Sequence, residues 1–340
     1  MTIDLRPFSE TVPDEVLERL SRTRRVLAVS HENPDADTIG ATLGVGLLVE
    51  AQGGRATLVC TDLVPRLYGF IEGVERFRTD PDPSEAYDLL VVSDCGTLDR
   101  IGAVRGRHAA LFDRLPRVII DHHASNGASG PADWVDPDAA ATCEMVALLA
   151  TRMGVPLDAA GGRLAGALIA GLVMDTATFA HPNTTPRTLA VAAALVAAGA
   201  PLSEASRRLY RTKPAAQLRL FGRVLDRLET AADGRIVHAA LLDADLAATG
   251  SEATYSEGII DLLAQAEQAD VAILFKEAPD GATRISVRTR PGGVDATVLT
   301  GVFGGGGHAR AAGATISAPL EGARPLVLAE AARLVAGRPD

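Results

Sequence analysis

Residues 26–41 read VLAVSHENPDADTIGA, and this stretch decides the fold class. Its first five residues are small or apolar, as in a buried strand, and the polar turn after them leads into a helical pattern over 38–52. Gly53 and Gly54 end that pattern with a C-cap and a turn. A buried strand followed directly by a long covering helix is the repeating unit of an α/β fold.

The same alternation continues on the C-terminal side of this stretch. Further strands are expected at 56–60, 89–93 and 118–121, and the pattern becomes mostly helical over 141–200. We therefore predict an N-terminal domain with a doubly wound, mostly parallel sheet that carries helices on both faces.

An Arg-rich stretch at 206–215 is predicted to link this domain, residues 1–205, to a smaller one at 216–340. The elements expected in the second domain are strands at 236–242, 271–275 and 284–289 and helices at 256–268, 295–302 and 325–335. This order predicts a smaller α/β domain with a mixed sheet.

The composition is that of a soluble protein with a large core. The chain has 340 residues, of which 47% are hydrophobic and 22% charged, enough for about two average domains. Its apolar stretches fall short of the roughly 18 residues of a spanning helix, and the start of the chain has no apolar leader, so we expect no membrane span and a cytoplasmic location. Three cysteines without CxxC spacing argue against disulfides and a thiolate zinc site.

The net charge of −10 excludes one class of nucleic-acid-binding protein. Proteins that bind long nucleic acids do so through many Lys and Arg contacts to successive phosphates. Any nucleic-acid substrate of this chain should therefore be short.

The chemistry is expected where the strands end, because ligands of doubly wound sheets bind beyond the carboxyl ends of the strands. Four apolar runs end in acids, two of them with histidine: VLAVS before His31, LLVVS before Asp94, RVII before Asp121, His122 and His123, and AGALIAGLVM before Asp175. A single Asp after a strand is often only a helix N-cap. Four together predict a metal cluster, and oxygen and nitrogen ligands without thiolate favour manganese or magnesium over structural zinc.

These segments resemble a known family. HENPDADTIGA, VVSDCG, VIIDHHASN and GLVMDTATF resemble the four ordered motifs of the DHH phosphoesterase superfamily, and FGGGGHARAAG at 303–313 resembles the glycine-rich signature of the DHH-associated domain. In length and spacing the chain is similar to the bifunctional oligoribonuclease (nanoRNase) and pAp-phosphatase branch. RecJ-like exonucleases of the superfamily usually carry additional domains, for which this chain has little room.

The resemblance implies two divalent metal ions, with manganese favoured and magnesium or cobalt as alternatives. The implied ligands are His31 and Asp35 for the first ion, Asp37, His122 and Asp175 for the second, and Asp94 as a bridge between them. A bridging carboxylate holds such ions about 3.5–4 Å apart, where they activate a water for attack on phosphorus.

Two further residues of the DHH triplet have implied roles. His123 would contact the scissile phosphate, and Asp121 would fix an imidazole through a hydrogen bond, although a helix cap is an alternative role for Asp121.

Substrate contacts are implied in the second domain, with the active site in the cleft between the two domains. The residues concerned are Ser286, Arg288, Gly305, Gly306, Gly307 and His308. The alternatives are a solvated strand Arg and a flexible glycine turn. The roles of His181 and Arg310 stay open.

The function expected is that of a hydrolase acting on phosphoester bonds. It would release nucleoside monophosphates from short single-stranded RNA, as an exoribonuclease, and convert 3′-phosphoadenosine 5′-phosphate (pAp) to AMP. Hydrolysis of cyclic or linear dinucleotides, such as c-di-AMP or pApA, is the alternative within this class. A catalytically idle nucleotide sensor is disfavoured because all six implied ligands are present. The relatives suggest a homodimer and no membrane partner.

Overall fold

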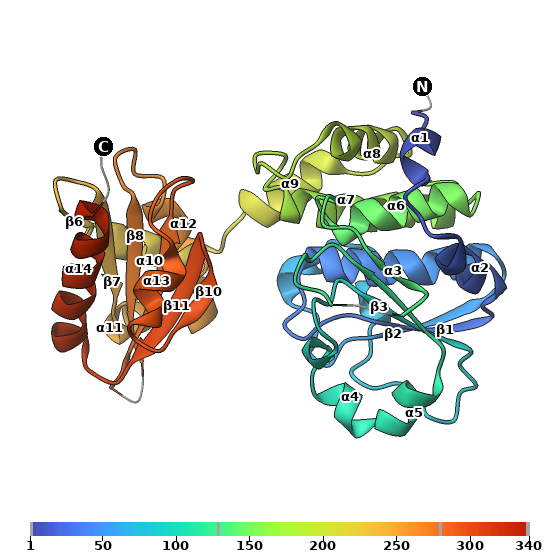
Figure 1. The fold of residues 1–340 in the computed structure, drawn as a ribbon, viewed down its shortest axis with the longest axis horizontal. Coiled ribbons are helices and arrows are strands. Elements are labelled where there is room, and N and C mark those ends of the chain that lie inside the picture. Colours follow the sequence, from blue (N-terminus) through green and yellow to red (C-terminus); the bar gives the residue numbers. More distant parts are fainter. Residues whose placement is uncertain (1–2, 128–129, 279–280, 338–340) are drawn as a thin grey trace. The chain divides into compact units, whose positions relative to one another are not determined.

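The computed structural model describes residues 3–127, 130–278 and 281–337. By its internal contacts the chain divides into two compact units, Met1–Thr212 and Lys213–Asp340 (Figure 1). Each unit is built on its own β-sheet with its own hydrophobic core. The prediction of a two-domain α/β protein is confirmed.

The N-terminal unit contains a five-stranded sheet within the described ranges, and all its strand pairs are parallel. In the order β2-β1-β3-β4-β5 the strands are Arg55–Val59, Arg25–Val29, Leu89–Ser93, Arg117–Asp121 and Asp133–Val135. The chain reverses its direction of winding between β1 and β3. In doubly wound folds the ligand binds at this switch point, outside the carboxyl ends of the two strands.

Helices cover both faces of this sheet, as the sequence predicted. They are α1 (Arg6–Ser9), α2 (Asp14–Arg22), α3 (Ala36–Ala51), α4 (Ala103–Arg107), α5 (Ala109–Arg114), α6 (Thr142–Arg152), α7 (Arg163–Asp175), α8 (Pro186–Ala197) and α9 (Leu202–Tyr210). Alternate strand residues face the two sides: Val26 and Ala28 belong to the core formed with α3, α6 and α7, whereas Leu27 and Val29 belong to the core formed with α4 and α5.

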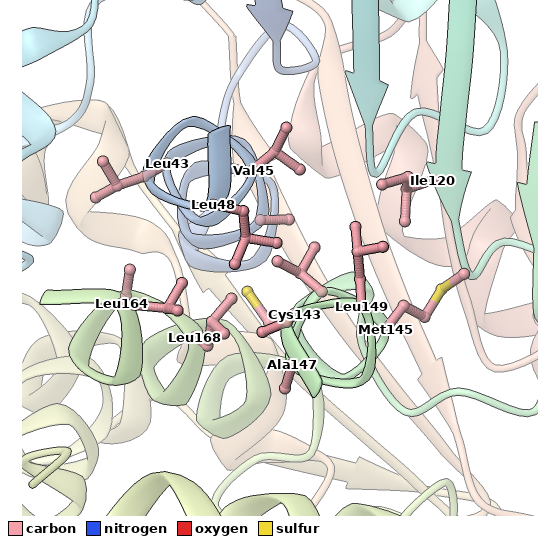
Figure 2. Close-up of a cluster of buried hydrophobic side chains, with 14 of the residues drawn as sticks. Leu43, Val45, Leu48, Ile120, Cys143, Met145, Ala147, Leu149, Leu164 and Leu168 are labelled. Atoms are coloured by element: carbon pink, nitrogen blue, oxygen red, sulfur yellow. The ribbon is translucent and has the colours of Figure 1, made fainter. Parts of the chain in front are cut away.

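Helix α3 lies between the sheet and the pair α6 and α7 (Figure 2). Every residue from 36 to 49 is buried, which explains why this helix is apolar all round rather than amphipathic. A Cβ atom on Gly40 would lie 2.5 Å from the carbonyl oxygen of Ala167, so glycine permits the close approach of α3 and α7. This packing brings the start of α3 beside the start of α6 and the end of α7.

The C-terminal unit has a mixed sheet, also as predicted. In the order β10-β11-β9-β8-β7-β6 its strands are Gly306–His308, Ala311–Ile316, Thr283–Thr289, Val271–Glu277, Ile236–Leu241 and Glu229–Ala231. Only the pair β7 and β8 is parallel in the part of the unit that the structure describes. The helices are α10 (Ala215–Leu225), α11 (Asp243–Thr249), α12 (Ile259–Leu263), α13 (Ala296–Gly301) and α14 (Leu320–Ala336).

Three expectations for this unit were wrong in extent. The helix expected at 256–268 is only α12, because Gly258 at its start takes a positive φ of 87° and i→i+3 bonds at Ala266 and Ala269 turn the chain into β8. Helix α14 begins at Leu320, and Pro325 lies inside it rather than at its first turn. The glycine-rich segment forms β10 and the start of β11 rather than a simple loop.

The connection between the units is short. Helix α9 reaches Tyr210 and α10 begins at Ala215, so much of the Arg-rich stretch is helical. Among the described residues no single helix is long and apolar enough to cross a membrane; α8 and α9 pass this test only together, as a pair bent by 113°. The three cysteines are free and buried.

Candidate metal centre

The predicted ligands come together at the switch point of the N-terminal sheet. His31 follows β1, Asp94 follows β3, His122 follows β4, Asp175 ends α7, and Asp35 and Asp37 lie at the start of α3. Donor atoms of His31, Asp35 and Asp94 lie within 4.8 Å of one another, and so do donor atoms of Asp37, His122 and Asp175. The structure therefore gathers all six residues into two neighbouring groups.

Asp94 lies between the two groups. Its Oδ2 is 3.5 Å from Nε2 of His31, and its Oδ1 is 3.5 Å from Nε2 of His122. The residue takes a positive φ of 57° and its N–H donates to the carbonyl of Ile120 at 2.9 Å. A left-handed backbone is uncommon outside glycine and concentrates at functional sites. The two carboxylate oxygens thus diverge towards different imidazoles.

Both imidazoles are oriented by backbone carbonyls. Nδ1 of His31 lies 2.6 Å from the carbonyl oxygen of Glu32, and Nδ1 of His122 lies 3.2 Å from that of Ala139. A proton on Nδ1 that is donated to a carbonyl leaves Nε2 with its lone pair free to bind a metal. In both residues Nε2 is the nitrogen that faces the carboxylates.

The carboxylates of this cluster repel one another. Burial and the negative charge of Asp94 raise the pKa of Asp37 to about 7. Burial and the charge of Asp37 raise the pKa of Asp175 well above its usual value. No Lys or Arg of the described ranges forms an ion pair with Asp37, Asp94 or Asp175. The oxygen and imidazole donors and the uncompensated negative charge fit divalent cations.

His31 responds to the same charges. Burial by itself would lower its pKa, but hydrogen bonding to Asp35 and Asp94 outweighs burial and raises the pKa to about 10. Without another cation, His31 therefore carries a proton near neutral pH. A metal ion at this site has to displace that proton.

Asp121 lies beside the cluster and holds His123. Its Oδ1 is 2.7 Å from Nδ1 of His123, and its Oδ2 accepts a 2.6 Å hydrogen bond from the side chain of Asn126. Burial opposes ionisation, but these bonds lower the pKa of Asp121, and the bond to Asp121 raises the pKa of His123. Residues 122–127 are not helical, so the helix-cap alternative for Asp121 is not supported.

The turn after Asp175 is strained. Ala177, Thr178 and Phe179 all take positive φ angles, of 47°, 59° and 64°. Nδ1 of the exposed His181 lies 3.1 Å from the carbonyl oxygen of Asp175, so this turn brings His181 back beside the end of α7. Such runs of left-handed residues are rare outside functional sites.

In the second unit, the predicted substrate residues occupy one face of the sheet. Ser286 of β9 pairs with Gly313 of β11, and Gly313 pairs with Gly306 of β10. In the next row Arg288 pairs with Ala311, and Ala311 pairs with the exposed His308. Alternate residues of a strand face opposite sides, so Ser286 and Arg288 share this face.

Glycine is required in this segment by space. A Cβ on Gly305 would lie 2.2 Å from the carbonyl oxygen of Gly313, and one on Gly307 would lie 2.5 Å from that of Ala311. Gly307 also has a φ of 143°. The glycines therefore let β10 lie close against β11, which is a structural reason for the run of four.

Two cations on the same face were missed by the sequence analysis. Lys276 of β8 pairs directly with Arg284 of β9, and both line a pocket of about 760 Å³ together with Ser256, Ser286, Gly304 and Gly305. Burial and the positive charges of Arg284 and Arg288 lower the pKa of Lys276. Arg288 is paired with Asp261 at 3.0 Å, whereas neither Lys276 nor Arg284 forms an ion pair within the described chain. The alternation RISVR over 284–288 was the available signal.

Comparison with known proteins identifies both units. Residues 25–172 match the family model described as DHH family, N-terminal domain, and residues 235–337 match the DHHA1 domain. The bifunctional oligoribonuclease and PAP phosphatase NrnA of Thermus thermophilus is 32% identical over 291 residues, covering 86% of this chain and 84% of that protein. The NrnA of Bacillus subtilis is 26% identical, covering 89% and 92%.

One solved structure has the same fold throughout. The exopolyphosphatase-related protein of Bacteroides fragilis superimposes with a TM-score of 0.85 over 95% of this chain and 96% of that one. At 21% sequence identity this likeness shows the fold alone.

The protonated state of the cluster predicts that metal binding depends on pH. Because Mn²⁺ must displace the proton of His31 and compete with protons on Asp37 and Asp175, its affinity should rise with pH, by roughly tenfold per pH unit for each displaced proton. Isothermal titration calorimetry at pH 6 and pH 8 measures the affinity, and buffers of different ionisation enthalpy count the protons released. An affinity that is equal at both pH values, with no proton release, would contradict this charge assignment.

Proposed function

The chain belongs to the DHH family, and we propose that it is a metal-dependent phosphoesterase that hydrolyses short oligoribonucleotides to nucleoside monophosphates and pAp to AMP. One observation carries this proposal: the two oxygens of Asp94 face the imidazoles of His31 and His122, in two adjacent groups of buried donors. The NrnA relatives, similar over most of the chain, support the choice of substrates. The complete donor set disfavours an idle sensor.

In the N-terminal unit, the six clustered residues would hold two divalent cations, with Asp94 shared between them. Cations at this place supply Lewis-acid stabilisation of charge on the phosphate and lower the pKa of the attacking water. His123, fixed by Asp121 at 2.7 Å, would donate to the scissile phosphate, and its raised pKa keeps a proton available for that hydrogen bond.

In the C-terminal unit, we propose that the open sheet face binds the rest of the substrate. Ser286, Arg288 and His308 share this face, and the backbone at Gly305, Gly306 and Gly307 offers N–H groups close to it. Lys276 and Arg284 add positive charge without an ion-pair partner in the described chain, so they suit a phosphate better than Arg288, which must first leave Asp261.

Three finer properties complete the proposal. Manganese is the proposed ion because the donors are carboxylates and imidazoles without thiolate. The proposed compartment is the cytoplasm, which suits three free cysteines. The proposed assembly is a homodimer, supported by Leu189 and Val196, which are 52% and 43% exposed and seven residues apart on α8.

A panel of substrates tests the function. With Mn²⁺, kcat/KM should be highest for RNA of two to four nucleotides and fall at least about tenfold by ten nucleotides, because a chain of net charge −10 repels each added phosphate. The panel includes pAp and linear and cyclic diadenylates. Excess chelator and Asp94→Asn serve as controls that should abolish turnover.

A length profile that is flat or rising to twenty-four nucleotides would contradict the short-substrate proposal. Preference for cyclic diadenylate over both RNA and pAp would replace it with the dinucleotide alternative.

The cations of the second unit generate a separate prediction. Lys276→Met and Arg284→Ala should each lower kcat/KM on short RNA by about ten- to a hundredfold, mainly through KM, since a charge-assisted contact to phosphate contributes about 1.5–3 kcal/mol. The matched control is Arg219→Ala, which removes the same charge from an exposed position on α10. Steady-state kinetics of the three variants decide between them. Equal, near-wild-type values in all three would exclude the pocket as a phosphate-binding site.

A further inference from the structure

Helix α6 begins directly against the metal centre. The residue before it, Ala141, has no side chain that could cap the helix. The carboxylate of Asp37 takes that place: the N–H of Thr142 donates to Oδ2 at 2.7 Å, and the N–H of Cys143 donates to Oδ1 at 2.9 Å. A carboxylate at a helix N-terminus is stabilised by these N–H groups and by the helix dipole. The first turn of α6 thus fixes Asp37 from the side of α3.

The side chain of Thr142 contacts a second member of the centre. Its Oγ1 donates to Oδ1 of Asp94 at 3.0 Å. That oxygen is the one that faces His122, whereas Oδ2 faces His31. Thr142 is fully buried and Asp94 is 2% exposed, so this hydroxyl cannot readily be replaced by bulk water. One residue therefore bonds to Asp37 through its backbone and to Asp94 through its side chain.

We propose that Thr142 is a positioning residue for the two-metal centre, which rests on the proposed function above. The hydroxyl fixes the rotation of the Asp94 carboxylate so that its oxygens point to different ion sites, and the N–H fixes Asp37 relative to it. A carboxylate can turn about its Cβ–Cγ bond at little cost, and a buried hydrogen bond removes that freedom. Thr142 is itself neither a ligand in this scheme nor a substrate contact.

Thr142→Val tests the hydroxyl, because valine keeps the shape and the backbone N–H. Thr142→Ser is the matched control that keeps the hydroxyl. In calorimetric titration with Mn²⁺, we expect Thr142→Val to weaken at least one site by about 10- to 100-fold, and Thr142→Ser to stay within about threefold of the wild type. Wild-type affinities and stoichiometry in Thr142→Val would overturn the proposal. Equal losses in both variants would overturn it as well, since shape rather than the hydroxyl would then decide.

Folding is checked with the single tryptophan, Trp134, which is buried in the N-terminal unit and 4% exposed. If Thr142→Val does not give the wild-type emission, Thr142→Ala replaces it in the same titration, with the same expected and overturning results.

A kinetic readout separates positioning from general stability. In Thr142→Val the Mn²⁺ concentration for half-maximal activity should rise, and kcat should fall, while KM for short RNA stays within about threefold. A merely structural role would lower the melting temperature of the metal-free protein and leave the Mn²⁺ dependence unchanged, which would overturn the proposal. The calorimetric result does not depend on the substrate, so a wrong proposed function would show as inactivity on the whole panel with the Mn²⁺ loss still present.

Discussion

The mutual repulsion of buried carboxylates is the constraint on which the centre depends. Two unit charges 4 Å apart interact by about 4 kcal/mol at an effective dielectric constant of 20. At the switch point this repulsion, together with burial, raises the pKa of Asp37 to about 7 and that of Asp175 well above its usual value. The N–H groups that begin α6 and the protonated His31 offset only part of it. Cations at this place therefore have a structural as well as a catalytic role.

The fold could be predicted where the sequence alternates between apolar runs and turn residues. Strand β3 coincides with the predicted range, and β1, β2 and β4 differ from theirs by a residue at one or both ends. Short elements escaped: β5 has three residues, and it exists because the sheet has an edge at which Trp134 can be buried. The length of α12 was overestimated because its apolar pattern continues into a turn that only the position of β8 dictates.

The centre was predictable because the rule for strand ends acts locally. His31, Asp94 and His122 each follow an apolar strand, and the direction of parallel strands alone brings them to one edge. Thr142 escaped because its role depends on how α6 packs against α3, which no periodicity records. Lys276 and Arg284 escaped because their pairing depends on the register of β8 and β9.

The central claim is that Asp94 is shared by two divalent ions. It is tested most directly by counting Mn²⁺ per chain in the purified, metal-loaded protein and recording its electron paramagnetic resonance spectrum. Two ions bridged by one carboxylate, about 3.5–4 Å apart, should give a stoichiometry of two and an exchange-coupled spectrum. One ion per chain, or two ions with independent six-line spectra, would contradict the shared carboxylate.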